Sequence, residues 1–162
     1  MLGHNGAPAD GVRFAADPTA RPPEPIDHMP LGRPDPSLIE IAATDSVQQT
    51  AARLRGEASD RGLTVFAVID HAAGARAAGL ELRDEVLVIL GAAKAGTPVM
   101  QAAARAGLDL PLHVLVWDDG GTTRLTYRDP RALATTHGID GIDQVLAALQ
   151  AGLNGLVTAA AG

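Results

Sequence analysis

Short apolar runs bounded by turn residues predict five strands in this chain. They are residues 38–42, 63–69, 86–90, 112–117 and 124–128. The second and third runs are apolar at nearly every position, which is typical of central strands covered on both faces. The last two runs flank Asp-Asp-Gly-Gly, a strong β-hairpin signal. The fifth run alternates charged with apolar residues, which favours an edge strand.

Apolar residues at three- and four-residue spacing predict helices between these strands. The expected helices span about 46–60, with a cap at Asp45 or Ser46, then 72–79, 98–106, 130–136 and 142–151. The resulting order, β-α-β-α-β-α-β-β-α-α, predicts an α+β fold: a two-layer domain with a mixed sheet of about five strands. If helices cover only one face of that sheet, a second copy of the chain is the simplest cover for the other, so we expect a homodimer.

The first 36 residues differ from the rest in composition. They hold eight of the eleven prolines and show no apolar period, so neither helix nor strand pairing is favoured there. We expect residues 1–36 to form an extended, disordered tail and residues 37–162 to form a single domain.

Charge and composition exclude several classes of partner. The net charge of -6 and the lack of a basic run argue against nucleic acid. The absence of cysteine excludes disulfides and thiolate zinc sites, and fits the cytoplasm, where we expect this protein. Residues 144–162 carry no charge, but they hold several polar residues and glycines and no flanking Lys or Arg, so no membrane span is expected.

The stretch from Gly91 to Met100 is the first candidate site. It follows an apolar strand and opens a helix, with Thr97 placed to cap that helix and Pro98 suited to its first position. Between Gly91 and Gly96 lies Lys94, the only lysine in a chain with twelve arginines. A helix start beside a cation favours an anion. An ordinary tight strand-to-helix connection explains the same residues.

Other candidate residues are single histidines and aromatics. His71 follows Asp70 at the end of a strand, and His137 ends a predicted helix. No histidine pair has metal-ligand spacing, so no metal site is expected, and no cofactor fingerprint is present. Trp117 and Tyr127 lie on the two strands of the predicted hairpin, where they can stack on a ligand or pack at a dimer interface.

Several spaced motifs together resemble the domain of unknown function 302 family. They are Asp70-His71-Ala-Ala-Gly74, Gly91-x-x-Lys94-Ala-Gly96-Thr97-Pro98-x-Met100-Gln101, Asp109-Leu-Pro-Leu112, Val116-Trp117, Tyr127-x-Asp129-Pro130 and His137-Gly138. The resemblance is strongest over residues 38–139. It implies a small bacterial or archaeal α/β domain that pairs into dimers, and it assigns no activity.

Three hypotheses on function follow. The first is a dimeric domain that binds a small anionic metabolite through Gly91, Lys94, Gly96 and Thr97, with Trp117, Tyr127 and His137 as further candidate ligand contacts. The second is an enzyme that uses Lys94 with His71 as acid and base. The third is an assembly module without a small-molecule site. Whether the protein is an enzyme stays open at this point.

Overall fold

The computed structural model describes residues 32–162, so residues 1–31 of the expected tail lie outside the described residues. Within them the helices and strands follow the expected order, with one added 3₁₀ helix, η2. The elements are β1 (Leu38–Ala42), α1 (Val47–Asp60), β2 (Thr64–Asp70), α2 (His71–Ala77), β3 (Glu85–Gly91), α3 (Ala93–Ala102), η2 (Ala104–Leu108), β4 (Leu112–Asp119), β5 (Thr122–Arg128), α4 (Ala132–His137) and α5 (Asp143–Ala161).

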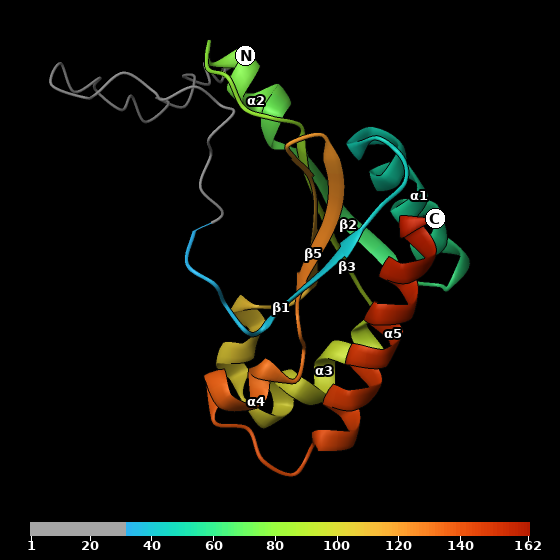
Figure 1. The fold of residues 1–162 in the computed structure, drawn as a ribbon. Coiled ribbons are helices and arrows are strands. Elements are labelled where there is room, and N and C mark those ends of the chain that lie inside the picture. The colour runs from blue at the N-terminus through green and yellow to red at the C-terminus, as the bar shows by residue number, and fades with distance from the viewer. Residues whose placement is uncertain (1–31) are drawn as a thin grey trace, which may run out of the picture.

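The strands form one five-stranded sheet in the order β1-β5-β4-β3-β2. The α+β fold is therefore confirmed. The expectation of a mixed sheet was wrong, because every neighbouring pair is antiparallel. A parallel pair needs a connection that crosses the face of the sheet. Here α2 and α3 lie at opposite ends of the sheet, so each lets the chain return beside the strand it has just left (Figure 1).

The positions of two strands differ from the prediction. β2 was expected at the centre and lies at an edge, while β5 was expected at an edge and lies between β1 and β4. The alternation of polar and apolar residues in β5 has another cause. Leu125 and Tyr127 are buried on the helix-covered face, and Arg124, Thr126 and Arg128 face the other side. The apolar run of β2 leaves Phe66 and Val68 58% and 42% exposed.

Helices α1 and α5 together cover one face of the sheet, which makes the domain two-layered (Figure 1). The main core lies between these helices and strands β3, β4 and β5. Its largest fully buried side chains include Leu54, Val86, Val88, Leu90, Val114, Val116, Leu125, Tyr127, Leu156 and Val157. A smaller apolar cluster joins α3, η2, α4 and the start of α5.

Helix α5 is longer than the sequence suggested. It was expected to end near Ala151, before Gly152 and Gly155, but it continues to Ala161. Leu153, Leu156 and Val157 keep its apolar face on the core, and this burial outweighs the helix cost of two glycines. Length and composition alone would allow α5 to cross a membrane. In this structure its C-terminal half packs on α1 and the sheet, where Leu153, Leu156 and Val157 join the main core.

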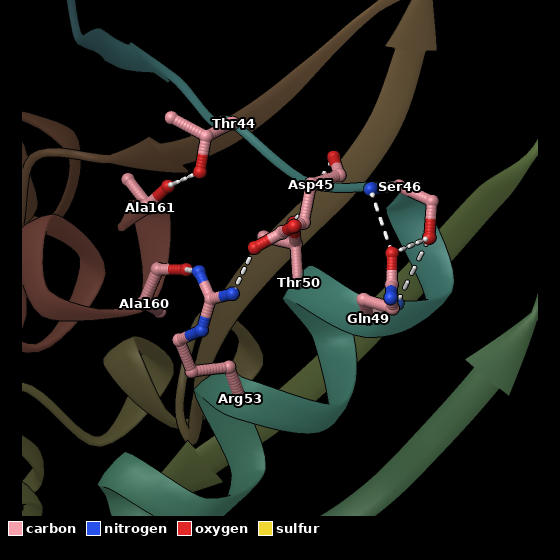
Figure 2. A network of polar contacts seen from close by, with 8 residues as sticks. All are labelled: Thr44, Asp45, Ser46, Gln49, Thr50, Arg53, Ala160 and Ala161. Carbon is pink, nitrogen blue, oxygen red and sulfur yellow. Dashed lines mark hydrogen bonds and ion pairs between the residues drawn. The ribbon is translucent and has the colours of Figure 1, made fainter.

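The end of α5 is bound to the segment before α1 and to α1 itself (Figure 2). Arg53 Nη1 donates to the carbonyl oxygen of Ala160 at 3.1 Å, and the same guanidinium forms an ion pair with Asp45. The amide of Thr44 donates to the carbonyl oxygen of Ala161 at 3.1 Å. These contacts satisfy two of the carbonyls that a helix end leaves without a helical partner.

Helix α1 begins with a capping box, which assigns its expected cap to Ser46 rather than Asp45. Ser46 Oγ accepts from the amide of Gln49 at 3.4 Å, and the Gln49 side chain accepts from the amide of Ser46 (Figure 2). Both interactions satisfy amides that the first helical turn would otherwise leave without a partner.

The described chain is attached to the fold two residues before the expected domain start. Asp35 Oδ2 accepts from Arg128 Nη1 at 2.8 Å, and its other oxygen accepts from the Ser37 amide at 2.9 Å. The Ser37 hydrogen bonds, with Arg128 as a further cause, lower the pKa of Asp35 to about 2. Asp35 thus contacts β5 through Arg128 although it precedes the expected domain boundary.

Neither α1 nor α5 covers the opposite face of the sheet, which we call the open face. Its residues alternate with those of the core and include Leu38, Glu40, Leu87, Ile89, Leu115, Trp117, Arg124, Thr126 and Arg128. Two cavities of about 280 and 230 Å³ lie along it and share Leu38, Leu115 and Thr126.

Candidate functional site at the junction of β3 and α3

The stretch from Gly91 to Thr97 is not a loop. β3 ends at Gly91 and α3 begins at Ala93, so Gly96 and Thr97 lie inside the helix. Ala92 occupies the cap position and makes no side-chain cap hydrogen bond, so the expected cap by Thr97 was wrong. The amide of Gly96 donates to the carbonyl oxygen of Ala92 at 3.0 Å, which closes the first helical turn. Alanines favour helix strongly enough to start it before Pro98.

Lys94 lies in the first turn of α3 with an exposed side chain. Among residues 32–162 it has no hydrogen-bond or ion-pair partner. Pro98, expected at the first helical position, lies in the interior of the helix one turn after Lys94. Proline has no amide hydrogen, so the carbonyl of Lys94 lacks its usual helical donor. The start of α3 thus carries an unpaired cation and no side-chain cap.

A cavity of about 620 Å³, which we call the larger cavity, lies between the start of α3, the end of β3 and α5. Arg61 and Lys94 are its charged lining residues, and no Asp or Glu of the described chain lines it. The other lining residues are Leu63, Leu90, Gly91, Ala92, Ala95, Pro98, Leu112, Gln144, Val145, Ala148, Leu149, Gly152 and Leu153. The wall is therefore apolar, with two cations and one amide.

A second cavity, the smaller cavity, occupies about 250 Å³ beside the same helix start. It shares Gly91, Ala92, Ala95, Leu112 and Leu149 with the larger cavity, and Phe66 and Met100 are among the residues that line it alone. Gly96 and Thr97 line this smaller cavity, whereas Lys94 lines the larger one. The four predicted residues from Gly91 to Thr97 are thus brought together around one helix turn with a cavity on each side.

His71 lies far from Lys94. Asp70 pairs with Val86 at the start of β3, whereas Lys94 follows the end of β3. Six residues of strand separate the two ends, or roughly 20 Å at about 3.3 Å per residue. Asp70 caps α2 by accepting from the amide of Ala73 at 2.7 Å, and this hydrogen bond lowers the pKa of Asp70. The structure therefore does not bring His71 and Lys94 together within one chain.

His137 has a partner outside the junction. Its Nε2 lies 2.6 Å from Asp109 Oδ2, which ties the end of α4 to the segment after η2. Asp129, close to His137 in sequence, forms an ion pair with Arg131, and that contact lowers the pKa of Asp129. No group of three or more His, Asp or Glu side chains suited to a metal ion occurs in residues 32–162.

The two candidate aromatics lie on opposite faces of the sheet. Tyr127 is buried in the core, where its hydroxyl donates to Asn154 Oδ1 at 3.0 Å and burial raises its pKa. Trp117 lies on the open face, where its Nε1 donates to Thr126 Oγ1 at 2.8 Å. Neither residue lines the cavities at the junction.

Sequence reasoning missed the part of the site that comes from distant segments. Arg61 is the cap residue that follows α1, and Gln144, Ala148 and Gly152 lie on α5. None of these residues belongs to a motif, so no local signal points to them. The small residues Ala148 and Gly152 leave the space that the larger cavity occupies.

Comparison with known proteins agrees with this fold. The crystal structure of an uncharacterized conserved DUF302 protein from Bacillus stearothermophilus superposes with a TM-score of 0.71 at 16% sequence identity. The match covers 78% of this chain and 99% of that chain, and at this identity it shows the fold alone.

Two curated relatives carry the name fluoride-specific ion channel FluC 1. They come from Brucella suis biovar 1 (strain 1330) and Brucella abortus biovar 1 (strain 9-941), and each is 38% identical to this chain over 130 residues. The matched segment is 79% of this chain but 51% and 48% of those proteins, so the chain spans about half the length of the curated relatives it matches.

The family model described as domain of unknown function DUF302 matches residues 39–159, from β1 almost to the end of α5. Because this match covers most of the chain and the solved DUF302 structure has the same fold, the protein belongs to the DUF302 family.

Proposed function

We propose that this domain is a dimeric cytoplasmic binding protein that takes a small anionic ligand at the start of α3, around residues 91–97. The observation that carries the proposal is the charge of the larger cavity. The chain holds 19 acidic and 13 basic residues, yet the charged residues lining this cavity are Arg61 and Lys94. An anion would be attracted there and repelled by much of the remaining surface.

The geometry of the helix start supports the same ligand charge. The first amides of α3 have no side-chain cap, and a helix N-terminus carries partial positive charge. Lys94, with no ionic partner in the described residues, adds a full charge beside them. Arg61 contributes less, because it already forms an ion pair with Glu57.

The names of the curated relatives provide one anion to test. Those proteins are called fluoride-specific channels, and this chain matches about half of their length. We therefore include fluoride among the anions assayed for binding to this domain, and we propose no transport activity for it.

The other two hypotheses receive less support from the structure. Catalysis by Lys94 with His71 would require groups at opposite ends of the β2–β3 pair to meet. The assembly hypothesis leaves the cationic lining of the cavity without a role. It makes a clear contrary prediction, since an assembly module would not be stabilised by any anion.

Thermal unfolding of the full chain with fluoride, phosphate or acetate tests anion binding. A binding anion at about one hundred times its dissociation constant should stabilise the wild type by about 2.7 kcal/mol. Lys94→Met should remove that stabilisation, whereas Arg105→Met, which removes an exposed cation outside both cavities, should retain it. The proposal fails if no anion stabilises the protein, or if Lys94→Met costs several kcal/mol without ligand.

A second variant tests whether the anion binds at the free amides of α3. Ala92 has the extended backbone of a cap residue, so Ala92→Asp can accept from the free amides of α3. We expect this variant to gain up to about 1 kcal/mol of stability and to lose anion binding, because its carboxylate competes for the same site. Unchanged anion affinity in Ala92→Asp would place the ligand elsewhere.

We also propose that the open face is the dimer interface. Leu87, Ile89, Leu115 and Trp117 lie on neighbouring strands β3 and β4 of this face, and Leu38 of the edge strand β1 lines the same cavities as Leu115. Burying such residues against a second copy is favourable by about 25 cal/mol per Å² of apolar area.

Light scattering tests the assembly. We expect twice the chain mass of 16.6 kDa for the wild type. Leu115→Glu should give a folded monomer, because its side chain would place a carboxylate in the interface. A monomeric wild type at micromolar concentration, or a dimer that persists in Leu115→Glu, would contradict this interface.

A further inference from the structure

The larger cavity is much more apolar than a site for a small inorganic anion requires. Most of its wall comes from aliphatic side chains on β3, β4 and α5, among them Leu90, Leu112, Leu149 and Leu153. Its volume of about 620 Å³ lies within the range of small-molecule sites, which is roughly 300–1,000 Å³. A phosphate or fluoride ion would leave most of this apolar wall without contact.

We propose that the ligand is an amphiphilic anion, namely a carboxylate with an unbranched or aryl apolar body. This inference rests on the proposed anion site and adds the chemistry of the rest of the ligand. The carboxylate lies at the start of α3 beside Lys94, and the apolar body extends along α5 over Leu149 and Leu153. Charge complementarity determines the orientation, because Lys94 and Arg61 are the charged lining residues.

The small residues of α5 provide the space for the apolar body. A Cβ atom added at Gly152 would meet no heavy atom within 4 Å, so the space next to this residue is open. Gly152 lines the larger cavity, whereas Gly155, one turn later and equally open, does not. The two glycines therefore form a matched pair for substitution.

Four probes of related structure test the ligand class by isothermal titration calorimetry on the full chain. They are octanoate, acetate, 1-octanol and octylammonium. Each fully buried methylene tightens binding about fourfold, so a tenfold gain needs about two of them. We expect octanoate to bind at least about tenfold more tightly than acetate and 1-octanol, and octylammonium to bind weakest.

Two substitutions on α5 then locate the apolar body. Gly152→Leu should weaken octanoate binding at least about tenfold by filling the cavity, and should leave acetate binding unchanged. Gly155→Leu should leave both affinities unchanged. Both replace a helical glycine with a better helix former, so neither is expected to unfold the protein.

Each contrary result would overturn a different part of the proposal. Equal affinity for acetate and octanoate would overturn the amphiphile and leave the anion site intact. Equal affinity for octanoate and 1-octanol would overturn the anionic head and with it the proposed function. If none of the four probes binds, the amphiphile is overturned, while fluoride and phosphate in the thermal assay still decide the anion site. Octanoate binding that is equally weakened by Gly152→Leu and Gly155→Leu would overturn the assigned position of the apolar body.

Discussion

Two regions of the molecule differ in how the free backbone groups at helix termini are satisfied. The first region consists of the start of α1 and the end of α5, and the second is the start of α3. At the first region Ser46 and Gln49 cap α1, while Arg53 and Thr44 bind the last carbonyls of α5 (Figure 2). At the second region α3 has no side-chain cap, and its lysine has no ionic partner in the described chain.

The two kinds of helix terminus have different consequences for stability and for ligand binding. Partnered termini add hydrogen bonds that hold the two main helices on the sheet. An uncapped terminus leaves donors free, which costs stability but lets a ligand supply the missing acceptor.

The largest expected contrast is in packing. Leu54 of α1 is fully buried, so Leu54→Ala should cost about 3 kcal/mol through lost contacts and the cavity it leaves. Met100 beside the smaller cavity is 38% exposed, and Met100→Ala should cost less than about 1 kcal/mol. Urea unfolding measures both changes. Equal losses would show that the α3 region is packed as tightly as the helix layer.

A smaller effect is expected at the end of α5. Arg53→Met removes the hydrogen bond to Ala160 and the ion pair with Asp45, and should cost about 1 to 2 kcal/mol, since both groups are partly exposed. Arg55→Met, an exposed position on the same helix, is the control and should change stability by less than about 0.5 kcal/mol. If both variants behave alike in urea unfolding, the contacts of Arg53 contribute nothing measurable.

Substitutions at the starts of α1 and α3 should change the free energy of unfolding in opposite directions. Ser46→Ala removes a working cap and should cost about 1 kcal/mol. Thr97→Ala removes no cap and improves helix propensity at an exposed position, so it should gain up to about 0.5 kcal/mol. Thermal and urea unfolding of both variants would check this. A loss of about 1 kcal/mol in Thr97→Ala would restore the original capping role of Thr97.

The smallest effect concerns pH and Asp35. The folded pKa of Asp35 is about 2, below its ordinary value of 3.8, so the ionised form is favoured by folding. Its contribution to stability is complete above about pH 4 and is lost as the pH falls through about 2. Asp35→Asn should therefore reduce the acid sensitivity of unfolding in that window and nowhere else. An identical pH profile for the wild type and the variant would show that Asp35 is free in solution.

The local sequence pattern was sufficient to predict most of the secondary structure. The strands from Leu38 to Ala42 and around Val86 to Leu90, the hairpin at Asp118 to Gly121 and the cap at Ser46 all lie where spacing and turn residues put them. Helix boundaries were less predictable. Thr97 and Pro98 resemble a helix start, but preceding alanines extend the helix past them.

The candidate site was predictable in part. Gly91, Lys94, Gly96 and Thr97 are neighbours in sequence, so any compact fold keeps them close. Arg61 and Gly152 carried no signal, because their role depends on the residue after α1, the start of α3 and α5 lining one cavity. The pairing of Lys94 with His71 was plausible along the chain, and the direction of β3 places the two residues at opposite ends.

The sequence by itself determined the α+β class, the order of elements and the position of Lys94 at a helix start, because periodicity, turn residues and propensity act over a few neighbouring residues. The tertiary structure alone decided that the sheet is wholly antiparallel, that β2 lies at its edge and that α5 forms a wall of an apolar cavity beside Lys94. These features depend on packing between segments far apart in the chain, where burial of a shared apolar face outweighs local preference.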